Sequence, residues 1–184
     1  MTRPAVAILG SARGDGNTRR LLDLVLGGRP VEVVDLLRLD VGYYDYEHRN
    51  AGDDFARVAP KLVAADAIVF ATPVYWYAMS AQLKTFVDRL SDLLQTRKEI
   101  GRALAGRTGY LVASSTDPEL PAGFEVPFEA TCGYFGMRWG GSFHGHFAKG
   151  GVLHPDVERA ARAFGDGIFG DGIFGDGAGG GAPA

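Results

Sequence analysis

The sequence AVAILGSARGDGNT, at residues 5–18, decides the fold of this chain. Its first part is an uninterrupted apolar run, residues 5–9, which predicts a strand buried on both faces of a parallel sheet. A glycine turn follows, and residues 19–26 continue as a helix. A strand, a glycine turn and a helix start in this order point backbone N–H groups and the helix dipole at an anion. The polar donors of this turn are Ser11, Arg13, Asn17 and Thr18.

The spacing of the glycines limits which phosphate this turn can bind. They fall at positions 10, 14 and 16, which fits neither the P-loop nor the dinucleotide fingerprint. Asp35, at the end of the next apolar run, is therefore interpreted as an ordinary strand-end carboxylate. The pattern favours the terminal phosphate of a mononucleotide, and a solvated glycine turn without a ligand is the alternative.

Composition limits the class of protein and its partners. The 184 residues have 46% hydrophobic content and a net charge of −3, which is typical of one globular domain. No basic stripe is present, so we expect no nucleic-acid partner. We also expect no membrane insertion and a cytoplasmic location, because no apolar run is long enough to span a bilayer and no signal peptide is apparent. The single cysteine, Cys132, excludes an internal disulfide.

The predicted elements alternate along the chain. Strands are expected at residues 5–9, 31–36, 67–71, 109–113 and 137–147. Helices are expected at residues 17–27, 53–65, 80–95, 125–135 and 155–164. This alternation predicts an α/β fold with a doubly wound, five-stranded parallel sheet. The domain is expected to cover residues 1–164, and the repeat FGDGI makes residues 165–184 a low-complexity tail too rich in glycine to hold a helix.

Three of these strands are followed by loops whose side chains could bind a ligand. The loops lie at the edge of the sheet where ligands bind in such folds. The second loop is TPVYWY at residues 72–77, where a proline-fixed turn carries three aromatic rings on which a planar heterocycle could stack. Packing of these rings in the core or at an interface is the alternative. The third loop, SSTDP at residues 114–118, is rich in hydroxyls. A tyrosine-rich stretch at residues 42–50 could wall a flat ligand, form a subunit contact or lie on the surface.

Two of these loops resemble signatures of one known family. Residues 10–18 look like the G-S-x-R-x-x-[GS]-N-[TS] phosphate loop of the NADPH-dependent FMN reductase family. Residues 72–89, with Leu83-Lys84 and Asp88-Arg89, are similar to its second signature, P-x-Y-x-x-x-x-x-x-L-K-x-x-x-D-R. The resemblance implies a flavodoxin-like three-layer sandwich with non-covalently bound FMN.

The resemblance also implies roles for individual residues. The FMN phosphate would be held by Ser11, Arg13, Asn17 and Thr18. The isoalloxazine would be lined by Pro73, Val74, Tyr75 and Trp76. The third flavin loop would be formed, by position more than by sequence, by Ser114, Ser115 and Thr116. Lys84, Asp88 and Arg89 are interpreted as structural, and Lys84 and Asp88 lie one helical turn apart and can pair.

The implied activity is that of an NAD(P)H-dependent oxidoreductase. NADPH or NADH would stack near Tyr75, Trp76 and Tyr44 and pass hydride to FMN, which then reduces a quinone, a free flavin or another small electron acceptor. No catalytic side chain is required. The alternatives are a flavodoxin-type electron carrier, which is usually strongly acidic, and a non-catalytic flavin-binding regulator. Arg13, Arg19 and Arg20 leave the choice of NADH or NADPH open.

Other features receive ordinary interpretations. We expect a homodimer or homotetramer from the resemblance, formed through residues 80–95 and the tyrosine-rich stretch. His144 and His146 lie two apart on a predicted strand, but no third ligand is in view and we expect no metal site. Cys132 is interpreted as a buried helix residue.

Overall fold

The computed structural model describes residues 3–170 and shows an α/β fold built on one six-stranded sheet. The strands are β1 (Ala5–Leu9), β2 (Glu32–Asp35), β3 (Ala67–Pro73), β4 (Thr108–Ser115), β5 (Arg138–Ala148) and β6 (Val152–Leu153). Their order across the sheet is β2-β1-β3-β4-β5-β6. Strands β1 to β5 pair in parallel, as the sequence predicts.

The predicted count of five parallel strands is wrong, because β6 adds a sixth strand that is antiparallel to β5. The chain leaves β5, turns through Gly150 and Gly151, which both have positive φ, and folds back for two residues. The sheet is therefore mixed. A strand of two residues is too short to show an apolar alternation in the sequence.

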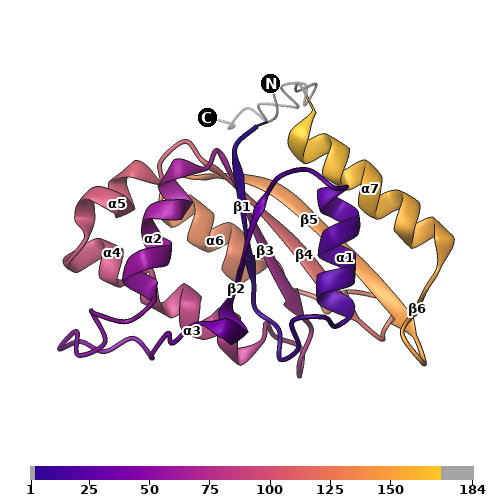
Figure 1. Cartoon of the computed structure of the whole chain (residues 1–184), viewed down its shortest axis with the longest axis horizontal. Coiled ribbons are helices and arrows are strands. Elements are labelled where there is room, and N and C mark those ends of the chain that lie inside the picture. Colours follow the sequence, from indigo (N-terminus) through magenta and orange to yellow (C-terminus); the bar gives the residue numbers. More distant parts are fainter. Residues whose placement is uncertain (1–2, 171–184) are drawn as a thin grey trace, which may run out of the picture.

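Helices cover both faces of this sheet, which gives three layers (Figure 1). They are α1 (Asn17–Leu26), α2 (Phe55–Ala64), α3 (Ala81–Arg89), α4 (Asp92–Gln95), α5 (Lys98–Ala103), α6 (Val126–Tyr134) and α7 (Pro155–Phe169), with a 3₁₀ turn, η1, at Leu36–Arg38. α1 and α7 lie on one face and the other helices on the opposite face. Asp35, the last residue of β2, is the N-cap of η1 and accepts a hydrogen bond from the backbone N–H of Leu37, which is a structural role.

The strands are apolar throughout because consecutive side chains enter two separate cores. Ile8 and Leu111 pack in the core under α2 to α6. Leu9 and Val112, one residue further along each strand, pack in the core under α1 and α7. All four are fully buried.

The helix expected at residues 80–95 is broken in two, and α5 was not predicted. After α3 the backbone hydrogen bonds shorten to i+3 spacing: the N–H of Leu90 donates to Val87, and that of Leu93 to Leu90. This tighter turn redirects the chain into α4 and α5. The change of direction keeps Leu93, Ile100 and Leu104 packed in the core under α2 to α6. A straight helix would carry these residues past the sheet.

The prediction that the last helix ends at Phe164 is wrong, because α7 continues to Phe169. Gly165 lies where α7 crosses α1, so close that a Cβ there would stand 1.8 Å from the carbonyl oxygen of Val25. The glycine costs helix propensity but allows this close packing, which buries Ile168 and Phe169. The rest of the predicted tail, residues 171–184, lies outside the described residues.

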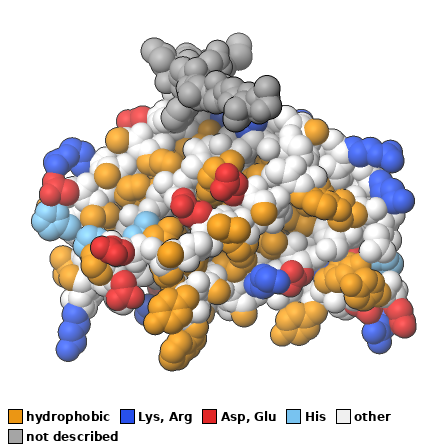
Figure 2. Space-filling model, turned by 180° about the vertical axis from the view of Figure 1, so that it is seen from behind, with side chains coloured by type: hydrophobic (Ala, Val, Ile, Leu, Met, Phe, Trp, Pro, Cys, Tyr) orange, Lys and Arg blue, Asp and Glu red, His pale blue; other side chains and the backbone are white. Residues whose placement is uncertain are grey.

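No helix within residues 3–170 combines the length and apolar character needed to cross a bilayer. Seen from behind, large hydrophobic side chains protrude along the lower edge of the molecule (Figure 2). This is the edge at which the loops after β1, β3 and β4 lie (Figure 1).

Replacing Gly165 with alanine should destabilise the protein, by about 1–3 kcal/mol, because the added methyl group collides with the α1 backbone. Urea unfolding followed by circular dichroism measures this. Gly133 of α6 is the matched control, since nothing lies within 4 Å of a Cβ there. Gly133→Ala should be neutral or stabilising by about 0.5–1 kcal/mol. Equal stability of the two variants would contradict the proposed packing.

Candidate functional site

The three loops predicted from the sequence meet in one cleft of about 340 Å³ at the carboxyl edge of the sheet. It is lined by Ser11, Arg13, Gly16, Asn17, Thr18, Pro73, Val74, Tyr75, Ser114, Ser115 and Thr116. Every predicted site residue except Trp76 is in this set. The residues come from the loop after β1, the end of β3 with its loop, and the end of β4 with its loop.

Residues 10–18 contribute hydrogen-bond donors and one arginine to the cleft. Gly16 is the N-cap of α1, and no side chain within residues 3–170 accepts a hydrogen bond from the first turn. The N–H groups at this end therefore leave the helix dipole open to an anion. Arg13 is exposed, and among the described residues its guanidinium forms no ion pair or hydrogen bond. The donor set is what a phosphate group requires.

The first loop is fixed against the start of α3. Gly10 approaches Leu83 so closely that a Cβ at residue 10 would lie 2.5 Å from the Leu83 Cβ. The hydroxyl of Ser80, the N-cap of α3, donates to the carbonyl oxygen of Gly10 at 2.7 Å. The backbone N–H of Ser80 donates to the hydroxyl oxygen of Thr72 at 2.9 Å. Because these groups are buried, the first and second loops hold one relative position.

Ser114 fixes the third loop to the other two. Its hydroxyl shares a hydrogen bond of 2.7 Å with the hydroxyl of Thr18, and both side chains are buried. Its carbonyl oxygen accepts a hydrogen bond from the backbone N–H of Val74 at 2.8 Å. Predicted site residues of all three loops thus contact one another directly. These hydrogen bonds connect the three walls of the cleft.

Trp76 is the predicted site residue that the structure leaves outside the cleft. Tyr75 and Ala78 exchange two backbone hydrogen bonds, so Trp76 and Tyr77 form the tip of a two-residue turn. Both have φ in the left-handed region, +48° and +65°, which is strained for bulky residues. The turn directs the Trp76 side chain into solvent, where it is 93% exposed.

His144 lies behind the third loop. From the sequence, it is considered only as a metal ligand, and no metal site is expected. Its Nε2 is 2.8 Å from the Ser115 hydroxyl oxygen, and that hydroxyl also donates to the carbonyl oxygen of Asp117 at 2.8 Å. Burial lowers the pKa of His144, the positive charge of His146 lowers it further, and Asp117 partly opposes both.

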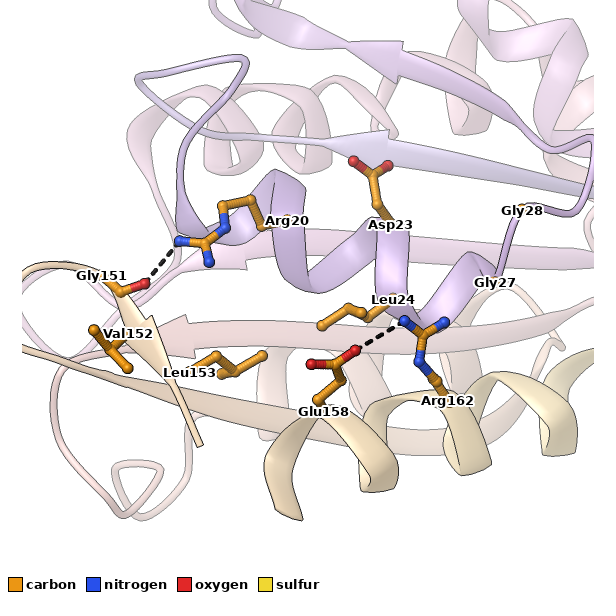
Figure 3. A pocket seen from close by; sticks show the side chains of 10 residues that line it. All are labelled: Arg20, Asp23, Leu24, Gly27, Gly28, Gly151, Val152, Leu153, Glu158 and Arg162. Carbon is orange, nitrogen blue, oxygen red and sulfur yellow. Dashed lines mark hydrogen bonds and ion pairs between the residues drawn. The ribbon is translucent and has the colours of Figure 1, made fainter. Parts of the chain in front are cut away.

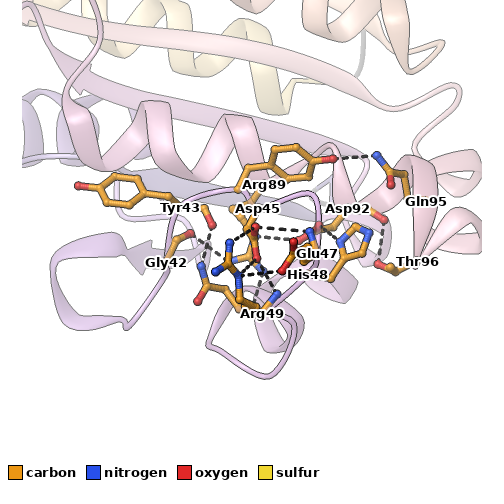
Figure 4. A network of polar contacts seen from close by, with 12 residues as sticks. Gly42, Tyr43, Asp45, Glu47, His48, Arg49, Arg89, Asp92, Gln95 and Thr96 are labelled. Atoms are coloured by element: carbon orange, nitrogen blue, oxygen red, sulfur yellow. Dashed lines mark hydrogen bonds and ion pairs between the residues drawn. The ribbon is translucent and has the colours of Figure 1, made fainter.

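The tyrosine-rich loop is fixed by Arg89, which is 2% exposed (Figure 4). Its guanidinium donates to the carbonyl oxygens of Gly42 and Asn50, and it pairs with the carboxylates of Asp53 and Asp92. Burial opposes the charge, but the two carboxylates outweigh it and raise the pKa of Arg89. The structural interpretation of Arg89 is confirmed.

Other structural interpretations from the sequence also hold. The Lys84 ammonium pairs with the Asp88 carboxylate at 2.6 Å on the surface of α3. Cys132 is 1% exposed on α6. Burial, with the charge of Glu129, raises the pKa of its thiol to about 11, so it stays an unreactive thiol near neutral pH.

A larger cavity of about 640 Å³ lies between α1, β6 and α7 (Figure 3). Its charged side chains already have partners: Arg20 donates to the Gly151 carbonyl oxygen, and Glu158 pairs with Arg162. Asp23 pairs with Arg19. Because these charged groups already pair with one another, they are not available to bind a ligand. The smaller cleft is therefore the better candidate site.

Comparison with known proteins then identifies the family. The sequence profile of the NADPH-dependent FMN reductases matches residues 4–120. The chain belongs to this family. FMN and reduced nicotinamide are the cofactor and co-substrate of its members, as the resemblance predicts.

One sequence relative and two solved structures are similar to this chain. YwqN of Bacillus subtilis (strain 168), named as an NAD(P)H-dependent FMN-containing oxidoreductase, is 27% identical over 166 residues, which are 85% of this chain and 90% of that protein. The Trp repressor binding protein from Bacillus subtilis superposes with a TM-score of 0.72 at 24% identity, covering 87% of this chain and 99% of that one. The general stress protein 14 of Treponema denticola, solved in complex with FMN, gives a TM-score of 0.64 at 21% identity, covering 88% and 95%. These structures support the flavodoxin-like fold.

Sequence reasoning missed two residues that organise the cleft. Ser80 could have been found, because a serine directly before the helical run of α3 is a typical N-cap. His144 could not, since its contact with Ser115 depends on the pairing of β4 with β5.

Arg13→Ala should weaken FMN binding about 10- to 100-fold, because the cleft loses its exposed guanidinium. Titration of the protein into FMN, followed by flavin fluorescence, measures the dissociation constant. Arg19→Ala is the matched control: Arg19 lies on the first turn of α1, pairs with Asp23 and does not line the cleft. If both variants bound FMN as the wild type does, the phosphate would lie elsewhere.

Proposed function

We propose that this protein binds FMN in the cleft and acts as an NAD(P)H-dependent oxidoreductase that reduces a quinone, a free flavin or another small acceptor. The observation that carries this proposal is the meeting of the three predicted loops in one cleft, joined by hydrogen bonds between predicted site residues. Membership of the FMN reductase family supports it.

The donor set of the first loop matches the FMN phosphate. The N–H groups at the start of α1, the hydroxyls of Ser11 and Thr18, and the guanidinium of Arg13 would surround its oxygens. Asn17 would add its amide. This arrangement places the dianion at the positive end of a helix dipole, where anions are stabilised.

The second and third loops would hold the ring system. Pro73, Val74 and Tyr75 present a rigid, largely apolar wall, and Ser114, Ser115 and Thr116 present hydroxyls and backbone N–H groups. Bound FMN supplies the hydride and electron chemistry, so the chain contributes orientation and electrostatics and needs no acid or base of its own. Hydrogen bonds between the loops restrict their motion, which lowers the entropy cost of binding.

The charge of the chain favours an enzyme over an electron carrier. Carriers of the flavodoxin type use strong negative charge to reach basic partners, whereas this chain has a net charge of −3.

Three arginines leave the choice between NADH and NADPH open in the sequence. Two of them, Arg19 and Arg20, have partners in the structure. Arg13 alone of the three has none among the described residues.

The proposed activity predicts that the flavin absorbance of the loaded protein bleaches rapidly under anaerobic conditions on addition of NADPH or NADH, and returns when a quinone is added. Stopped-flow absorbance with each nucleotide measures both half-reactions and the donor preference. Bound flavin that neither nucleotide reduces would indicate the carrier or the regulator. A protein that binds no flavin would refute the whole proposal.

We also propose that the chain forms a homodimer or a homotetramer. Within residues 3–170, the loops between helices and strands expose the aromatic side chains of Tyr43, Tyr46, Tyr75, Trp76 and Tyr77. Trp76 and Tyr77 form the tip of a turn whose backbone is closed by two hydrogen bonds between Tyr75 and Ala78. Exposed aromatic side chains are typical anchors of protein interfaces.

Sedimentation equilibrium tests this proposal. The wild type should sediment as a dimer or tetramer, and Trp76→Ser combined with Tyr77→Ser should shift the equilibrium toward the monomer. Tyr134→Ser, which removes one exposed aromatic ring from α6 and none from these loops, is the control. A monomeric wild type would contradict the proposal.

A further inference from the structure

The Ser115 hydroxyl, at the end of β4, lies between a carbonyl group and an imidazole. Its oxygen is 2.8 Å from the carbonyl oxygen of Asp117 and 2.8 Å from Nε2 of His144. Ser115 lines the cleft, whereas His144 stands on the neighbouring strand β5 and does not. His144 therefore reaches the cleft through Ser115.

Counting hydrogens decides which group donates. A carbonyl oxygen only accepts, and a serine hydroxyl has one hydrogen, so Ser115 donates it to Asp117. The second contact then requires a hydrogen on Nε2 of His144. Once both bonds are made, the direction of the Ser115 O–H is fixed, and its remaining lone pair is available to a ligand.

The surroundings of His144 set its charge. His146 lies on the same strand face, Asp117 faces it from the third loop, and Glu125 at the start of α6 accepts a hydrogen bond from Ser142, two residues along β5. Burial is the largest effect and lowers the pKa of His144, and His146 adds to it. The free protein thus holds a neutral ring at neutral pH, with its hydrogen on Nε2.

We propose that His144 is a positioning residue of the cleft: it fixes the Ser115 hydroxyl so that the remaining lone pair of its oxygen faces the ligand, and it takes up a proton when an anionic flavin nucleotide binds. This rests on the proposed function, because FMN supplies the negative charge. An anion nearby favours the imidazolium form, so binding becomes linked to proton uptake. The imidazolium keeps its Nε2–H, and the hydrogen bond to Ser115 persists in both charge states.

The linkage has a defined sign. The pKa of His144 is lowered in the free protein and rises when the anion binds, so His144 adds to the affinity as the pH falls through its pKa in the complex and adds nothing well above that pKa. The FMN phosphate itself titrates near pH 6, and that effect is common to all variants. Comparing the affinities of the variants at each pH therefore isolates the contribution of His144 to FMN binding.

Measured FMN dissociation constants for two substitutions separate position from charge. His144→Gln keeps an N–H donor but cannot titrate; it should bind FMN as the wild type does at about pH 8 and several-fold more weakly than the wild type at about pH 5.5. His144→Leu loses both the donor and the titrating group, so it should bind about tenfold more weakly than the wild type at about pH 8 and more weakly still at about pH 5.5.

A double-mutant cycle tests whether His144 acts through Ser115. In a Ser115→Ala background, His144→Leu should cause little further loss at about pH 8, because the bond is already absent. The free protein gives an independent readout: nitrogen NMR should show the Nε2–H tautomer of His144 in the wild type. If His144→Leu does not fold, the comparison of the wild type with His144→Gln and the tautomer of His144 still test the proposal.

Either of two results would overturn the proposal: identical pH profiles for the wild type and His144→Gln, or a hydrogen on Nδ1 in place of Nε2 in the free protein. A wild type that binds no FMN would instead refute the proposed function. In that case the tautomer still tests the positioning of Ser115.

Discussion

The contact between Gly10 and the start of α3 is the constraint on which the cleft depends. Only a residue without a side chain can bring the end of β1 this close to Leu83. The Ser80 hydroxyl then donates to the carbonyl oxygen of Gly10, and the Ser80 backbone is held by Thr72. One serine thus joins the first and second loops, and the N-terminus of α1 comes to face the end of β3.

Further hydrogen bonds connect these loops to the neighbouring strands and helices. The pair formed by Thr18 and Ser114 joins α1 to β4, and the contact of Ser115 with His144 joins β4 to β5. On the other side, buried Arg89 holds the tyrosine-rich loop through two carboxylates and two carbonyl oxygens. Removing one member of such a buried network leaves unpaired polar groups, which is costly. The structure therefore places rigid polar supports around a small cleft at the edge of a parallel sheet.

The sequence predicted what local chemistry encodes. The parallel strands read as apolar runs because both faces of the sheet are covered, and the first and second loops carry glycine, proline and hydroxyl side chains in a specific spacing. It could not predict features that arise from contacts distant in the chain. Gly165 looked like a helix breaker and instead permits the crossing with α1, while Trp76 looked like a cleft residue and is turned outward by its backbone. The role of His144 depends on strand pairing alone.

The central claim is that the loop after β1 binds a phosphate group, and the affinities for FMN and riboflavin test it most directly. The two ligands share the ring system and differ in the phosphate. We expect FMN to bind at least about 100-fold more tightly than riboflavin, since several charge-assisted hydrogen bonds and the helix dipole act on the phosphate alone. Equal affinities would contradict the account, because the ring would then bind without help from residues 10–18.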